Sequence, residues 1–169
     1  MIVWKDVFTK DELLSDGMKN VRELENGLLL ACDSYNVMLG GGDYGIANND
    51  EEAMGAGGDT AGAESVNVVV DAFKLQNIQL PRKDFQVYIK KYSKRLKEYL
   101  ENENPSRVAA FMEGMKEWVP KMLKEFDEYE FYMGPSCDPD ALLVLAKYEG
   151  ESHYPTFLYL KDGLAEEKF

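Results

Sequence analysis

Two stretches of the chain repeat hydrophobic residues at the spacing of an α-helix. They cover residues 82–101 and 105–126. The apolar positions are Phe85, Tyr88, Ile89, Tyr92, Leu96, Tyr99 and Leu100 in the first stretch, and Val108, Phe111, Met112, Met115, Val119, Met122, Leu123 and Phe126 in the second. Residues spaced at i, i+3 and i+4 share one face of a helix. Because only residues 102–104 separate the stretches, we predict an antiparallel helical hairpin over residues 81–126.

Prolines accompany both predicted helices. Pro81 suits the first position of the first helix, where no backbone N–H is needed. Asn104 can cap the second helix, with Pro105 at its first position. Pro120 removes a backbone donor inside the second helix, so we expect a kink there.

Short apolar runs typical of β-strands occupy both ends of the chain. The clearest runs are Ile2–Trp4, Leu28–Cys32, Val37–Leu39, Tyr129–Met133, Leu142–Tyr148 and Thr156–Leu160. Asn26-Gly27 directly precedes the second run and predicts a hairpin turn. Another apolar segment, Val66–Phe73, fits either a strand or a short helix.

Residues 40–65 differ sharply in composition from the rest of the chain. They hold eight of the fourteen glycines and six acidic residues, with no lysine or arginine. Glycine loses the most backbone freedom on folding, and this segment has little apolar area to offset that loss. We therefore predict a mobile acidic loop over residues 40–65.

The order of elements is strands, loop, helical hairpin, strands. Helices segregated from strands in this way indicate the α+β class rather than alternating α/β. The length of 169 residues fits a single domain. Within residues 1–169 we expect a β core formed by residues 1–39, 66–80 and 127–169.

The net charge of the chain disfavours negatively charged partners. Acidic residues outnumber basic ones by 31 to 19, for a net charge of −12, which opposes binding to nucleic acid or to anionic membranes. The longest apolar run, Ala141–Ala146, is far shorter than a membrane span. Charges at Lys5 and Asp6 do not fit a signal peptide, so we expect a cytoplasmic protein.

The motifs of common active and metal sites are poorly matched. Gly40–Gly45 has the spacing G-x-G-x-x-G, but acidic residues follow where a phosphate-binding helix should begin. Asp138, Asp140 and Glu149 match three positions of an EF-hand loop whose interior is apolar. His153, the only histidine, lies in a turn-like segment. No enzyme class is indicated, and we predict a protein without catalytic residues.

The first predicted helix is basic, unlike the rest of the chain. Residues 82–101 include seven basic and three acidic residues, a net charge of +4. The basic residues are Arg82, Lys83, Lys90, Lys91, Lys94, Arg95 and Lys97. Two interpretations remain: a solvated face that balances the acidic loop, or a docking patch for an acidic protein surface.

The chain resembles the translationally controlled tumour protein family along nearly its whole length. The matching segments are Ile2–Phe8, Asp11-Glu12, Ser15-Asp16, Gly45–Asn48, Glu52, Tyr88–Tyr92, Pro105 with Arg107-Val108, Phe131–Gly134, Asp138–Asp140, Pro155, Lys161–Leu164 and Glu167-Lys168. Each segment is short, but the ordered set is specific.

The resemblance implies a β-tent core with a projecting helical hairpin. It also implies a non-enzymatic cytosolic protein linked to calcium binding, microtubules and growth and survival control. Ras-type small GTPases and an elongation-factor exchange subunit are further partners that the family suggests, and release without a signal peptide is a further family property. The resemblance places Glu12 at the GTPase-facing surface, and we expect Asp11-Glu12 to lie in an exposed turn.

Four positions depart from the family pattern. Asp50 stands where the loop motif usually has serine, and Pro135 where glutamate usually follows Gly134. Ala141 replaces a usual glycine. The chain ends in Phe169 rather than the cysteine of many animal members, so dimerisation through a terminal disulfide is not expected.

Three functional hypotheses follow. The first is a calcium-binding, microtubule-associated protein whose tubulin-facing residues are Lys90, Lys91, Lys94, Arg95 and Lys97. Its calcium ligands are not assignable, beyond a guess at the acidic loop. The second is an exchange-factor-like regulator of a Ras-type GTPase that acts through Glu12. The third is a thiol enzyme that uses Cys32 or Cys137, although each precedes an aspartate that disfavours the thiolate.

Overall fold

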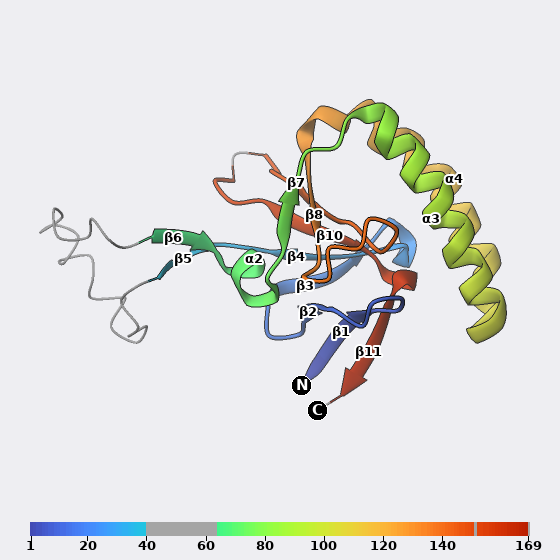
Figure 1. The fold of residues 1–169 in the computed structure, drawn as a ribbon, viewed down its shortest axis with the longest axis horizontal. Coiled ribbons are helices and arrows are strands. Elements are labelled where there is room, and N and C mark those ends of the chain that lie inside the picture. The colour runs from blue at the N-terminus through green and yellow to red at the C-terminus, as the bar shows by residue number, and fades with distance from the viewer. Residues whose placement is uncertain (40–63, 151, 169) are drawn as a thin grey trace, which may run out of the picture.

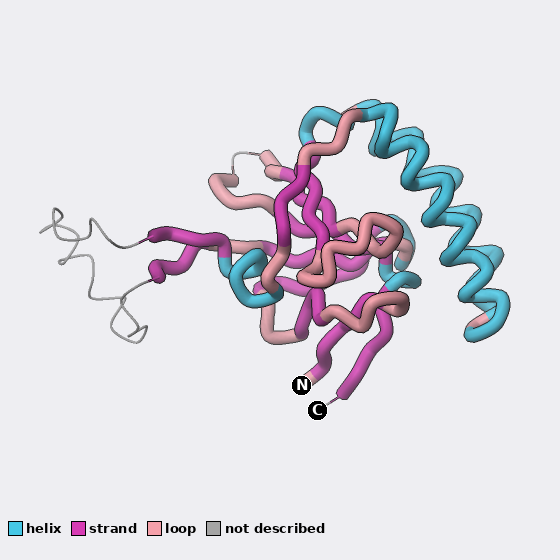
Figure 2. Tube along the Cα trace, in the orientation of Figure 1, coloured by secondary structure: helices cyan, strands magenta, loops and turns pink. Residues whose placement is uncertain are grey.

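The computed structural model describes residues 1–39, 64–150 and 152–168 (Figure 1). Its strands form antiparallel sheets, and a long helical hairpin lies along one side of them (Figure 2). The predicted α+β class is therefore confirmed. Most of the predicted loop, residues 40–63, lies outside the described residues, so the prediction of its mobility stays open.

The largest sheet has six strands. Its order is β3 (Lys19–Leu24), β4 (Leu29–Asp33), β10 (Thr156–Leu160), β9 (Val144–Lys147), β8 (Tyr129–Met133) and β7 (Gln76–Ile78). The Asn26-Gly27 turn joins β3 and β4 through a short 3₁₀ turn, η1 (Glu25–Gly27), as the hairpin signal predicted. All five residues of β10 are buried, which places this strand at the centre of the core.

Two smaller sheets complete the β structure. One has the order β11 (Leu164–Lys168), β1 (Ile2–Asp6) and β2 (Glu12–Ser15), and the other pairs β5 (Asn36–Leu39) with β6 (Glu64–Asn67). β6 begins two residues inside the predicted loop. The predicted apolar runs left out β2, β3, β7 and β11. β2 and β7 are short, β3 has no buried residue, and four of the five residues of β11 are exposed.

The ambiguous segment after the loop forms both a strand and a helix. β6 leads directly into α2 (Val68–Phe73). The Asn67 side-chain oxygen accepts hydrogen bonds from the backbone N–H groups of Val69 and Val70, at 2.9 and 3.3 Å. This cap satisfies donors that the first turn of a helix leaves free, and it explains why the strand ends here.

The helical hairpin consists of α3 (Arg82–Glu103) and α4 (Val108–Lys124). Pro81 occupies the capping position of α3 rather than its first helical position. A 3₁₀ turn, η4 (Pro105–Arg107), precedes α4, and the Asn104 side chain accepts a bond from the Ser106 hydroxyl instead of capping the backbone. The predicted side-chain cap at Asn104 is therefore wrong. α4 continues through Pro120.

The apolar faces of the hairpin agree largely with the pattern. The buried residues are Phe85, Ile89, Tyr92, Leu96 and Leu100 in α3, and Phe111, Met115, Trp118 and Met122 in α4. Met112 was predicted to be core, but 39% of its surface is exposed. Trp118, which the pattern omitted, is buried instead. The buried face of α4 therefore runs through Met115 and Trp118 and does not include Met112.

The apolar face of α3 packs on the sheets as well as on α4. The Phe85 ring lies 5.8 Å from that of Phe126 and 5.3 Å from that of Phe131, centroid to centroid. Tyr92 meets Phe8 edge to face at 6.0 Å. Besides α4, this face therefore packs on aromatic residues from both ends of the chain, Phe8 after β1 and Phe126 and Phe131 after the hairpin.

Candidate interaction surface

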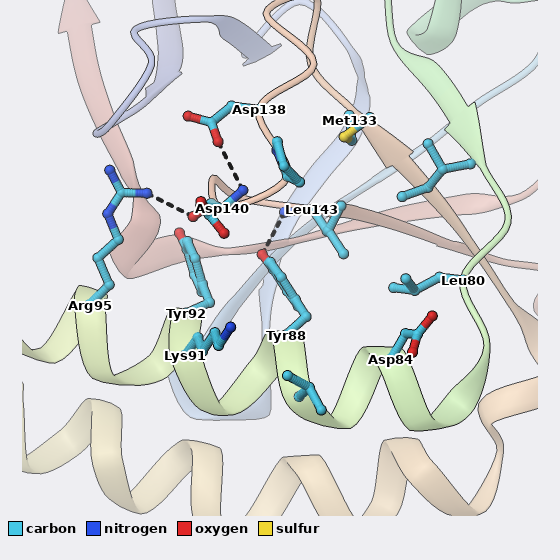
Figure 3. Close-up of a pocket in the computed structure, with 13 residues that line it drawn as sticks. Leu80, Asp84, Tyr88, Lys91, Tyr92, Arg95, Met133, Asp138, Asp140 and Leu143 are labelled. Carbon is cyan, nitrogen blue, oxygen red and sulfur yellow. Dashed lines mark hydrogen bonds between the residues drawn. The ribbon is translucent and has the colours of Figure 1, made fainter.

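Tyr88 anchors the middle of α3 to the segment before β9. Its hydroxyl donates a hydrogen bond to the Ala141 carbonyl at 2.7 Å. It also accepts one from the Leu143 N–H at 3.0 Å, which Figure 3 shows. Desolvation raises the pKa of the Tyr88 hydroxyl, so it stays protonated and keeps both bonds at neutral pH. The two bonds therefore fix the position of α3 relative to the segment that leads into β9.

Arg95 forms a second anchor one to two turns further along α3. Its Nη1 donates to the Asp140 carbonyl at 2.8 Å (Figure 3), and its guanidinium carbon lies 3.8 Å from the centroid of the Phe8 ring. A guanidinium stacked on an aromatic face combines electrostatic attraction with packing. Among the predicted tubulin-facing residues, Arg95 is thus already engaged inside the protein.

A cavity of about 690 Å³ lies between α3, the β7–α3 connection and the segment before β9 (Figure 3). Its apolar side includes Ile78, Leu80, Val87, Met133 and Leu143, and its polar side includes Asp84, Lys91, Arg95, Asp138 and Asp140. The volume falls in the range of ligand pockets, but the polar side carries both carboxylates and cations. The cavity therefore does not favour one ligand charge.

The five cations predicted to face tubulin divide between two sides of α3. Lys91 and Arg95 border the cavity just described. Lys90, Lys94 and Lys97 border a groove between α3 and α4. The division follows from helical geometry, because positions i, i+4 and i+7 share a face and position i+1 is rotated by about 100°.

Four lysines of α3 differ in exposure but share the lack of an ion pair with any described residue. Lys90, Lys91 and Lys94 are exposed, whereas Lys97 is half-buried. Within the described part of the chain, none of these four lies within ion-pair distance of a carboxylate. Although Lys91 lies on a different side of the helix from Lys90 and Lys94, we refer to these three exposed lysines together as the basic face of α3.

Glu12 lies on a different part of the molecule. It is exposed at the first position of β2, an edge strand, where its register partner is Lys5 of β1. The sequence-based description of Glu12 as a turn residue is corrected by this pairing. The neighbouring Asp11 accepts hydrogen bonds from the Ser136 N–H at 3.0 Å and the Ser136 hydroxyl at 2.7 Å. Glu12 is the residue of this acidic pair that is open to a partner.

We looked for a preformed metal site in the described ranges 1–39, 64–150 and 152–168. In these ranges, no three His, Cys, Asp or Glu residues lie close enough together to hold a metal ion. The EF-hand-like residues serve a turn, since Asp138 accepts a bond from the Asp140 N–H at 2.8 Å. β9 occupies the interior of that motif. The guess at calcium ligands in the acidic loop concerns residues that are mostly outside the described ones.

The two cysteines lie in different environments. Cys32 is buried, and desolvation raises the pKa of its thiol to about 12, so the nucleophilic thiolate is scarce at neutral pH. Cys137 is exposed. His153 is exposed and lies in a bend, as its turn-like context predicted. These environments give no support to the thiol-enzyme hypothesis at Cys32.

Comparison with known proteins identifies the family of this chain. The family model described as translationally controlled tumour protein matches residues 1–165. The chain belongs to the translationally controlled tumour protein family. A homologue of that name from Theileria annulata is 39% identical, with both chains covered completely. The Saccharomyces cerevisiae homologue is 37% identical over 99% of each chain.

Solved structures of family members share the fold. The translationally controlled tumor-associated protein of Schizosaccharomyces pombe superposes with a TM-score of 0.81 at 36% identity, with both chains covered completely. The Caenorhabditis elegans protein gives a TM-score of 0.70 at 25% identity and covers 100% of this chain and 99% of its own. The family resemblance and the fold that it implied are confirmed. Over the described residues, no helix is both long enough and apolar enough to span a membrane.

Proposed function

We propose that this member of the translationally controlled tumour protein family is a non-enzymatic cytoplasmic interaction protein that associates with microtubules and acts in growth and survival control. The observation that carries the proposal is the basic face of α3. Lys90, Lys91 and Lys94 are exposed and form no ion pair with another described residue, on a chain whose net charge is −12. A concentrated positive patch on an acidic protein favours contact with an acidic surface, as the family link to tubulin requires.

The anchoring of α3 supports this role. Tyr88 and Arg95 tie the helix to the segment before β9, so the basic face is presented on a rigid element. A preorganised patch loses less side-chain and backbone entropy on binding than a flexible tail with the same charge. Exposed charges nevertheless remain well screened, so the affinity is expected to be modest.

Co-sedimentation with microtubules tests the proposal directly. Because charges are screened over about 8 Å at physiological ionic strength, binding should weaken steadily as salt is raised. Binding that does not change with salt would contradict a contact made by the basic face. The fraction pelleted at low and high salt, with a tubulin-free control, is the quantity to measure.

Weak calcium binding is the second element of the proposal. Carboxylates are abundant, but the described residues hold no preformed cage, and loosely arranged oxygen ligands bind Ca²⁺ with dissociation constants of about 10⁻⁴ to 10⁻³ M. Calorimetric titration with CaCl₂ tests this range. Sub-micromolar affinity, or no binding at millimolar calcium, would refute it.

A second candidate function is regulation of a Ras-type small GTPase through Glu12. The exposure of Glu12 on the edge strand β2 favours it, because an acidic side chain there can reach a basic or metal-binding site on a partner. An elongation-factor exchange subunit is a further partner proposed from the family alone. Measuring nucleotide release from a panel of small GTPases, with and without this protein, distinguishes the exchange role from the microtubule role.

A further inference from the structure

The helical hairpin carries an open groove along the seam of its two helices. The groove has a volume of about 870 Å³. Its apolar lining consists of Ile89, Ala109, Met112, Met115 and Val119, and its charged lining consists of Lys90, Lys94, Lys97, Glu113 and Lys116. An apolar floor between charged rims is the pattern of a helix-binding groove.

The rims of the groove are strongly positive. Four lysines face one acid, Glu113, which gives a net charge of +3. Three of the lysines come from α3, and Lys116 comes from α4. Across the residues that the structure describes, none of the four forms an ion pair. Their charge is thus available to a partner that brings carboxylates to both rims.

The floor of the groove leaves an apolar stripe uncovered. Met112 is one of the few large hydrophobic residues that are exposed among those described, at 39%. Ala109, Met112 and Val119 line up along α4 at i, i+3 and i+10, the repeat of one helix face. Methionine fills irregular gaps and adapts to different partners, which makes it common at helix-binding surfaces.

The dimensions of the groove suit a third helix. Residues 90–97 of α3 rise by about 10 Å, two turns, and residues 109–119 of α4 rise by about 15 Å. A partner helix of that length presents apolar residues at i, i+3 or i+4 and i+7. Those residues can insert between the lysine rims, while flanking acids reach Lys94 and Lys116.

We propose that this groove binds an amphipathic helix of a partner protein, with acidic residues on both sides of an apolar stripe. Charge complementarity selects this occupant over a second copy of the chain, because two grooves of +3 repel each other. The proposal goes beyond the microtubule contact. The two share Lys90 and Lys94, but the helix site depends on the apolar floor and the microtubule contact does not.

A designed peptide tests the proposal. The probe is a fluorescent helical peptide of about 18 residues, with leucine at i, i+3, i+4 and i+7 and glutamate on the flanks. A scrambled peptide with the same composition keeps the charge but loses the stripe. Anisotropy measures binding to the full chain, and amide chemical shifts map its location. We expect the ordered peptide to bind at least about tenfold more tightly, with shifts at Ser93, Ala109 and Met112.

Variants of the protein separate the groove from general electrostatics. Met112→Asp places a charge on the floor, and Lys94→Glu reverses one rim. Lys91→Glu is the matched control, because it makes the same charge change on the same helix but borders the other cavity. We expect at least about a tenfold loss for the first two variants and less than about a threefold loss for the control. Circular dichroism establishes that each variant is folded.

The results distinguish this proposal from the proposed function. Loss of peptide binding in Met112→Asp, whether or not microtubule binding persists, supports the helix site. Equal binding of the ordered and scrambled peptides, equal losses in Lys94→Glu and Lys91→Glu, or shifts confined to the other cavity would overturn it. Loss of microtubule binding alone in a lysine variant bears only on the proposed function.

Discussion

Arg107 and Asp162 form a two-pronged ion pair that ties the start of the second hairpin helix to the turn before the last strand. The Arg107 Nε lies 2.8 Å from Asp162 Oδ1, and its Nη2 lies 2.8 Å from Oδ2. Only 6% of the Asp162 side chain is exposed. Two parallel bonds fix both groups in one orientation, so this pair sets where the hairpin meets the β core.

Replacing Arg107 by lysine should destabilise the fold by about 2 kcal/mol. Lysine keeps the charge but cannot make two parallel bonds, and the buried carboxylate of Asp162 is left with an unmet acceptor. Urea unfolding followed by circular dichroism measures the loss. Arg22→Lys, at an ion pair in which both side chains are 32% exposed, should cost less than half as much. Equal costs would contradict the importance assigned to Asp162 burial.

Replacing Tyr88 by phenylalanine should cost about 1–3 kcal/mol of unfolding free energy. The variant leaves the Ala141 carbonyl and the Leu143 N–H without their shared partner while keeping the ring in place. Tyr148→Phe is a control at an exposed position and should change stability by less than about 0.5 kcal/mol. Hydrogen exchange at the Leu143 amide should accelerate in Tyr88→Phe only.

The two thiols should react with iodoacetamide at very different rates near neutral pH. Cys137 is exposed and should be modified in the native protein. Cys32 is buried, and the pKa of its thiol is raised to about 12, so both access and the thiolate fraction are low until the protein unfolds. Mass spectrometry should find one modified cysteine in buffer and two in denaturant. Rapid modification of native Cys32 would revive the thiol-enzyme hypothesis.

Reversing Lys90, Lys91 and Lys94 to glutamate should abolish microtubule co-sedimentation. The three side chains are exposed and make no ion pair within the part of the chain that the structure describes, so stability should change by no more than about 1 kcal/mol. Reversal of Lys19, Lys124 and Lys168, exposed lysines on other elements, is the matched control for overall charge. If the α3 variant still sediments, or both triple variants lose binding equally, the basic face is only a solvated surface.

Replacing Glu12 by valine should weaken binding to a small GTPase partner if the second candidate function holds. Glu12 is exposed at the start of β2, so the change should leave the fold intact. Asp16→Val removes an exposed acid a few residues away and serves as control. Unchanged affinity in folded Glu12→Val would end the assignment of this residue.

The sequence was sufficient for features that depend on local spacing. Both hairpin helices were predictable because apolar residues repeat at the helical period, and Tyr129–Met133 and Thr156–Leu160 coincide with β8 and β10. The basic character of α3 was equally visible. Glu12, by contrast, was selected through family resemblance, since one acidic residue has no signal of its own.

Tertiary structure decided the features that depend on distant partners. β11 is mostly exposed and charged, and it is a strand because β1 lies beside it. Trp118 is buried and Met112 is exposed, and the packing of α4 against the rest of the protein decides which of the two sides is covered. Arg95 becomes an anchor only when Phe8 and Asp140 approach it. Hydrophobic periodicity determines which residues share a face, whereas non-local packing determines what that face contacts, and therefore which cations of α3 stay free.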